Sequence, residues 1–103
     1  GFDAGAFDPL SRMLASAETF RAMTRQVMDL AGDICSGRLV MAHEGGYSEV
    51  YVPFCGHAVL QEMSGSAITA PDPFKATLEA RQPAPSFDAY LDGLIDEMAS
   101  ALS

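Results

Sequence analysis

The chain has 103 residues, with six basic and fourteen acidic side chains that give a formal net charge of −8 and a pI near 4.4. This length suits one small domain, and an apolar fraction of 49% provides for a packed core and argues against disorder. The few Lys and Arg residues are scattered, so a direct nucleic-acid partner is not expected. The sequence has no apolar run of the ~18 residues that a membrane span needs, and it shows no signal peptide, so a membrane partner is not expected either.

The first fifteen residues, GFDAGAFDPLSRMLA, are typical of the end of a strand that runs into a loop. Asp8 marks the loop because it precedes a proline, which disfavours helix at this position. Ser16 is a candidate N-cap for an amphipathic helix over about 17–36, and Gly37 is placed to end that helix.

Residues 38–42 form a short apolar run without alternation, as expected for a strand covered on both faces. A tight loop over 43–47 follows. A second helix is predicted over about 48–63, with its start near Pro53 because proline is tolerated only in the first turn.

The proline-rich residues 64–85 predict an extended connector, and Ser86 is a candidate cap for a final amphipathic helix over about 87–102. The alternation of strands and helices predicts an α/β fold, a parallel sheet with helices on both faces. One strand end and one strand cannot make such a sheet. We therefore expect a C-terminal portion of one domain, with a βαβα core segment over 1–63, the connector over 64–85 and a helix over 86–103.

Loops that leave two strands of a right-handed βαβ unit lie at one edge of the sheet, where open α/β sheets bind ligands. Asp3 and Tyr47 leave the two predicted strands, so they are expected to face one cleft. From the residues alone, Asp3 is compatible with a metal ligand, a catalytic base or a turn former, and Tyr47 with a packed aromatic. His43 and His57 are isolated and are interpreted as structural or solvent-facing.

These motifs together resemble the distal part of the histone deacetylases, within the acetylpolyamine amidohydrolase superfamily. The similarity is greatest to the class II type and to bacterial histone deacetylase-like amidohydrolases, and it runs from residue 1 to about 75. The residues that carry it are GFDA at 1–4, FDPL at 7–10, GRLV at 37–40, HEGGYS at 43–48 and YVPFCG at 51–56.

The resemblance implies the arginase-deacetylase fold and a zinc-dependent amidohydrolase that removes acetyl groups from acetyl-lysine peptides or acetylated polyamines. Asp3 matches a ligand of the catalytic zinc ion. Tyr47 matches the tyrosine that hydrogen-bonds the substrate carbonyl and its tetrahedral intermediate. Leu10 matches a residue that lines the acyl-lysine channel, and Gly45 and Gly46 match the wall beside the tyrosine.

The family's other zinc ligands come from an Asp-x-His motif and its general base from a His-His pair, and this sequence contains neither motif. One carboxylate cannot hold zinc in a catalytic geometry, so the isolated chain is expected to be inactive. The alternatives are a stand-alone helical interaction module, a truncated remnant and an inactive family member. Cys35 and Cys55 suit a reducing cytoplasm, and the sequence is compatible with an oligomer.

Overall fold

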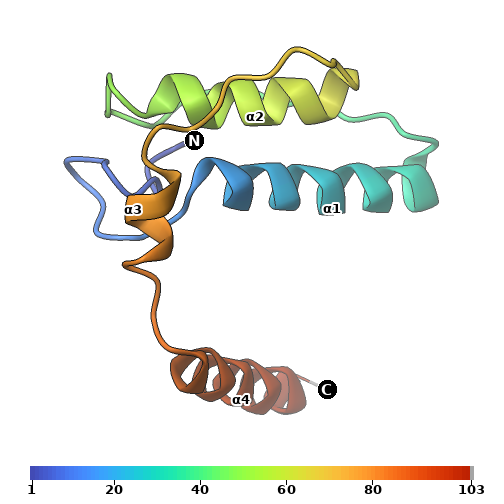
Figure 1. The fold of residues 1–103 in the computed structure, drawn as a ribbon. Helices are drawn as coiled ribbons and strands as arrows, with labels where there is room; N and C mark the ends of the chain where they lie inside the picture. The colour runs from blue at the N-terminus through green and yellow to red at the C-terminus, as the bar shows by residue number, and fades with distance from the viewer. Residues whose placement is uncertain (103) are drawn as a thin grey trace.

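The computed structural model describes residues 1–102, which form four helices joined by extended loops (Figure 1). The first helix, α1, spans Ala17–Cys35 and confirms the helix predicted over about 17–36. Ser16 and Thr19 form a reciprocal capping box, in which each side chain accepts the backbone N–H of the other residue. The helix ends where Ser36 and Gly37 adopt positive φ angles of 57° and 74°.

Helix α2 spans Val52–Ser64 and has Pro53 in its first turn, so its start near this proline is confirmed. The predicted connector contains a short helix, α3 (Lys75–Glu79). This helix was not predicted, because the prolines around it indicated an extended segment. Helix α4 spans Pro85–Leu102. It begins one residue before Ser86, which therefore lies inside the helix and does not cap it.

The predicted parallel sheet is wrong for the described part of the chain, because residues 1–102 contain four helices and only one isolated bridge, between Gly5 and Ala15. Residues 38–42 are extended but have no neighbouring strand there. A strand is held by hydrogen bonds to its neighbours, so an apolar run alone does not make one. The first segment folds back locally instead, with the Ala6 N–H donating to the Ala15 carbonyl at 3.0 Å.

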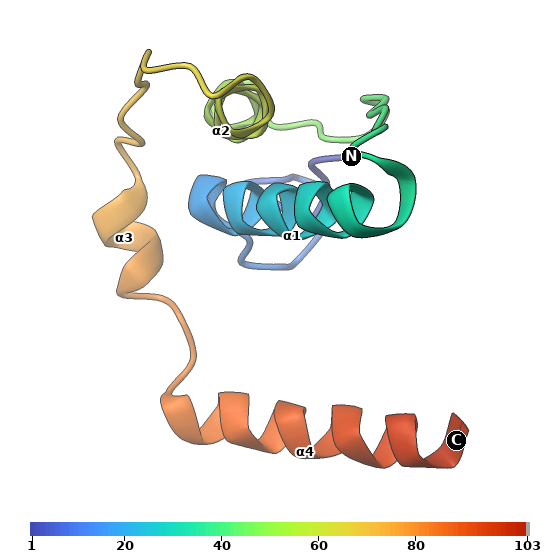
Figure 2. The same ribbon diagram turned by 90° about the vertical axis from the view of Figure 1, so that its right-hand side faces the viewer.

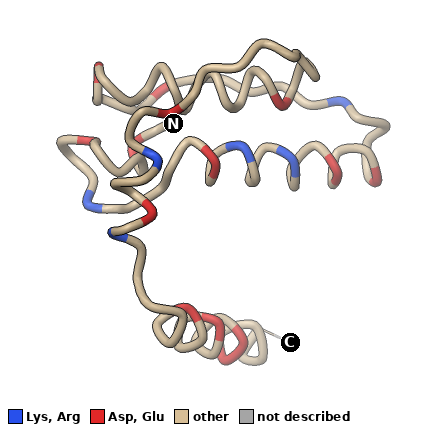
Figure 3. Tube along the Cα trace, viewed as in Figure 1, with Lys and Arg blue, Asp and Glu red and all other residues tan. Residues whose placement is uncertain are grey.

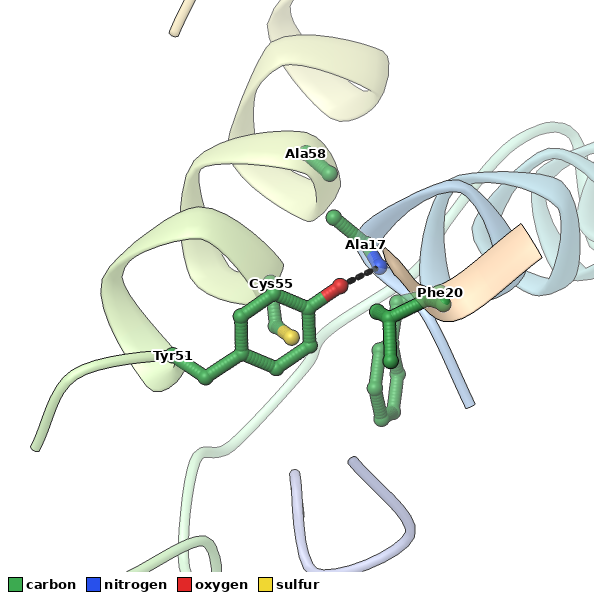
Figure 4. Close-up of a cluster of buried hydrophobic side chains, with 6 residues drawn as sticks. Ala17, Phe20, Tyr51, Cys55 and Ala58 are labelled. Atoms are coloured by element: carbon green, nitrogen blue, oxygen red, sulfur yellow. Dashed lines mark hydrogen bonds between the residues drawn. The ribbon is translucent and has the colours of Figure 1, made fainter. Parts of the chain in front are cut away.

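A small hydrophobic core forms where α1, α2 and α3 meet (Figure 4). Tyr51, Cys55 and Leu78 are each 1% exposed. Aromatic rings from the N-terminal loop and the residues before α3 pack around Tyr51, with ring centroids 5.2 Å away for Phe7 and 5.8 Å for Phe74. This core fixes the N-terminal loop against α1 and α2.

Helix α4 lies apart from the α1–α2 pair in both views (Figures 1 and 2), and none of its described residues is buried. Its charged side chains are all acidic (Figure 3). No helix among residues 1–102 is long and apolar enough to cross a membrane.

Candidate active site

The GFDA and EGGY segments lie side by side even though no sheet connects them. The Phe2 N–H donates to the Gly45 carbonyl at 2.8 Å. A side chain at Gly45 would overlap the Asp3 carboxylate, and a Cβ at Gly46 would lie only 2.7 Å from the Phe2 Cβ. Gly46 also has a φ of +115°, so a glycine at position 46 is required for this close approach to the Phe2 backbone, whereas the overlap at Gly45 is with the Asp3 side chain.

Asp8 links the loop that carries Leu10 to the loop that carries Tyr47. Its Oδ1 accepts the backbone N–H groups of Leu10 at 2.8 Å and Ser11 at 2.9 Å, and its Oδ2 accepts the Tyr47 N–H at 2.8 Å. The hydrogen bond from Tyr47, with those from Ser11 and Leu10, holds the pKa of Asp8 below its ordinary value against the opposing effect of burial. Asp8 is thus an ionised acceptor shared by two loops.

From the sequence, Asp8 was expected to mark a loop before a proline and to belong to the FDPL motif, with no role assigned to its side chain. The signal that could have revealed its role is local, since an aspartate often accepts backbone N–H groups two or three residues further on. Its bond to Tyr47 spans 39 positions of the chain, and no local pattern predicts such a contact.

The side chains of Leu10 and Tyr47 point away from the core, with exposed fractions of 75% and 56%. Asp3 is partly exposed. The structure therefore brings the backbones of the predicted site residues together through Gly45 and Asp8. Within residues 1–102, the hydroxyl of Tyr47 has no hydrogen-bond partner, so it is available as a donor.

No group of three His, Cys, Asp or Glu side chains in the described chain could hold a metal ion. Asp3 has the chemistry of a zinc ligand, but no set of three ligands that includes it comes together in this part of the chain. His43 supports the loop, because its Nε2 lies 2.9 Å from the Gly45 carbonyl oxygen and its ring centroid lies 5.0 Å from that of Phe2. His57 lies partly buried in α2.

A second tyrosine, Tyr51, has a structural environment that differs from that of Tyr47. Its hydroxyl accepts the Ala17 N–H at 2.9 Å and donates to Asp72 Oδ2 at 2.7 Å (Figure 4 shows the first bond). Burial, with the bond to Asp72, raises the pKa of Tyr51 well above its ordinary value. Tyr51 therefore stays neutral and joins the start of α1 to the loop before α3.

An apolar groove of about 400 Å³ lies between α1 and α2, on the side of the residues preceding the EGGY loop. It is lined by Met23, Val27, Val59 and other apolar residues, with Thr24 and His43 as its polar side chains. This lining offers no carboxylate or thiol.

Comparison with known proteins matches residues 1–63 to the histone deacetylase domain family. Over 97% of its length, the chain is 48% identical to a histone deacetylase-like amidohydrolase of Pseudomonas aeruginosa, of which it covers 26%. It is 36% identical to histone deacetylase 8 of Arabidopsis thaliana over 59% of the chain and 16% of that protein. It is also 35% identical to a probable deacetylase of Archaeoglobus fulgidus, over 63% of the chain and 19% of that protein.

The chain thus spans about a quarter or less of these relatives. The family match covers the GFDA segment, Asp8, the EGGY loop and nearly all of α2. The chain belongs to the histone deacetylase family.

Proposed function

We propose that this chain forms part of a deacetylase that hydrolyses the acetyl amide of acetyl-lysine or of an acetylated polyamine. The observation that carries the proposal is the family match over residues 1–63, which includes both site segments. The contact between Phe2 and Gly45 supports it, because it holds a carboxylate-bearing segment beside a tyrosine-bearing one. This proposal requires a longer protein, the complete enzyme.

Tyr47 is proposed as the donor to the substrate carbonyl. As water adds to an amide, negative charge grows on the carbonyl oxygen, and a fixed O–H donor aimed at that oxygen stabilises the transition state. The exposed phenol of Tyr47 supports this role. Gly45 and Gly46 are proposed as the wall beside it, and the exposed, apolar Leu10 suits contact with the methylene chain of the substrate.

Asp3 is proposed as one ligand of a zinc ion. The described residues do not fit a complete zinc site by themselves, since no three ligands come together among them. The other ligands and the general base are therefore proposed to come from outside this chain, and the isolated chain is expected to be inactive.

We further propose a cytoplasmic location. Cys35 and Cys55 are both free thiols, and Cys55 is buried. Burial raises the pKa of Cys55 to about 12, so its reactive thiolate form is rare at neutral pH. Unpaired cysteines suit a reducing compartment.

The proposal is tested by Tyr47→Phe in the complete enzyme, with an acetyl-lysine peptide and an acetylated polyamine as substrates. Removing one such donor is expected to lower kcat roughly 100- to 1,000-fold. KM should change little, because the donor acts mainly in the transition state. The measurement is the steady-state rate of acetate release.

The matched control is Tyr90→Phe, which removes the same hydroxyl from a 61% exposed tyrosine on α4. It should leave kcat unchanged. Equal turnover by the Tyr47→Phe and wild-type enzymes would refute the role of Tyr47. Wild-type protein that releases no acetate from either substrate would refute the proposed function.

A further inference from the structure

Tyr47 is an exposed residue whose backbone is anchored by a carboxylate distant in the sequence. Two glycines precede it, its phenol is 56% exposed, and its backbone N–H donates to a side chain 39 positions away, that of Asp8. The Gly45 carbonyl accepts the Phe2 N–H at 2.8 Å, but neither glycine has a side chain that could pack against the tyrosine. The position of the phenol therefore depends strongly on the hydrogen bond that anchors its own backbone.

The burial and the hydrogen bonds of Asp8 suit it to anchor the backbone of Tyr47. It is only 7% exposed, and both of its carboxylate oxygens are occupied by backbone N–H donors from two different loops. Hydrogen bonds to an ionised acceptor are shorter and stronger than those between neutral groups. A single rigid side chain thus sets the distance between the Leu10 loop and the Tyr47 loop.

We infer that Asp8 is a positioning residue of the proposed deacetylase site, which fixes the Tyr47 donor relative to the loop that carries Leu10. The inference rests on the proposed function, because it gives Tyr47 a reaction to act in. Asp8 itself has no contact with substrate in this scheme, and its effect on turnover passes through Tyr47.

The chemistry of the carboxylate suggests a nearly isosteric test. Asn has one carbonyl oxygen, and its NH₂ group only donates, so it cannot accept N–H groups on both sides. Asp8→Asn must therefore turn its NH₂ group toward the N–H groups of either the Leu10 loop or Tyr47. Because the Tyr47 loop contributes one bond and the Leu10 loop two, we expect the bond to Tyr47 to be lost.

In the complete enzyme, Asp8→Asn is expected to lower kcat about 10- to 100-fold, the size of effect that a displacement of about 1 Å produces. The decisive measurement is a double-mutant cycle with Tyr47→Phe. If Asp8 acts through Tyr47, adding Asp8→Asn to the Tyr47→Phe enzyme should reduce kcat by less than about 3-fold. Hydrogen–deuterium exchange should also rise in a peptide that covers residues 43–51.

The matched structural control is Asp72→Asn. Asp72 also uses both oxygens, one for the Phe74 N–H at 2.8 Å and one for the Tyr51 hydroxyl at 2.7 Å. It supports the core and has no bond to either site loop. Asp72→Asn should lower the melting temperature yet leave kcat unchanged at temperatures where the protein is folded.

The possible results separate the positioning role of Asp8 from the proposed deacetylase function. Equal losses of kcat in the wild-type and Tyr47→Phe backgrounds would overturn the positioning role, as would equal losses in Asp8→Asn and Asp72→Asn. Unchanged exchange over residues 43–51 in Asp8→Asn would overturn the anchoring itself. A wild-type enzyme without deacetylase activity would overturn the proposed function and the catalytic part of the inference together, while the exchange measurement would still decide whether Asp8 anchors the loop.

Discussion

Gly46 holds a backbone conformation that L side chains rarely adopt, with a φ of +115°. The space around it is also closed, because a Cβ there would lie 2.7 Å from the Cβ of Phe2. Two independent effects therefore require glycine, a torsional one and a steric one. Gly37 allows them to be separated, since its φ is +74° but nothing lies within 4 Å of an added Cβ.

Gly46→Ala and Gly37→Ala should both lower the free energy of unfolding, by different amounts. Gly37→Ala carries only the torsional term, on the order of 1 kcal/mol. Gly46→Ala adds the overlap with Phe2 and is expected to lose about 1–3 kcal/mol more. Denaturant titration followed by circular dichroism measures both values. Equal losses in the two variants would show that the contact with Phe2 is easily relieved.

At the scale of elements, the helices could be predicted from local signals. Apolar spacing and the Ser16 cap predicted α1, and the position of Pro53 predicted the start of α2. Periodicity does not tell which apolar residues are covered: Val27 and Ile34 lie at helical spacing in α1, yet they are 43% and 73% exposed. Whether an apolar side chain of α1 is buried depends on packing partners that are distant in the sequence.

The elements that were not predicted correctly depend on contacts rather than on composition. The run over 38–42 has the residues of a buried strand but no partner strand among residues 1–102, so it stays extended without a ladder. Helix α3 has only five residues and is set by packing, with Leu78 1% exposed against the core. For the site, motifs predicted Asp3 and Tyr47 as candidates, but no local pattern predicts the bond from Tyr47 to Asp8, because the two residues are 39 positions apart.

Tyr51, at the start of α2, is linked through its hydroxyl to the start of α1 and to the loop before α3. Tyr51→Phe would leave the Ala17 N–H, at the buried start of α1, without a partner. An unsatisfied buried donor costs about 1–3 kcal/mol, so the free energy of unfolding should fall by that amount. Tyr90→Phe on the exposed face of α4 should change it by less than about 0.5 kcal/mol. Thermal unfolding of both variants decides this, and a loss below that of Tyr90→Phe would mean that the hydroxyl has no structural role.

For the whole molecule, the described chain divides into a packed unit and an outlying helix. The histone deacetylase match ends at residue 63, within the last turn of α2, while α4 buries none of its described side chains. The division into a segment over 1–63, a connector over 64–85 and a C-terminal helix over 86–103 stays a prediction, and the core crosses its first boundary because Leu78 of α3 is buried in it. Ser103 lies outside the described residues. The strand–helix order first expected for 1–63 is replaced by the loops and helices that the structure shows.

The distribution of chemistry over the molecule leads to the last prediction, which concerns the 103-residue chain by itself. It carries one proposed zinc ligand, and no three candidate ligands meet among its described residues. Catalytic zinc needs three protein ligands. The purified chain should therefore retain no stoichiometric zinc after dialysis, as measured by metal analysis, and should release no acetate from an acetyl-lysine peptide. The complete enzyme, treated identically, provides the control: it should retain stoichiometric zinc and release acetate from the same peptide. Turnover by the isolated chain would contradict the division of the site, because it would mean that these residues assemble a hydrolytic centre without ligands from elsewhere.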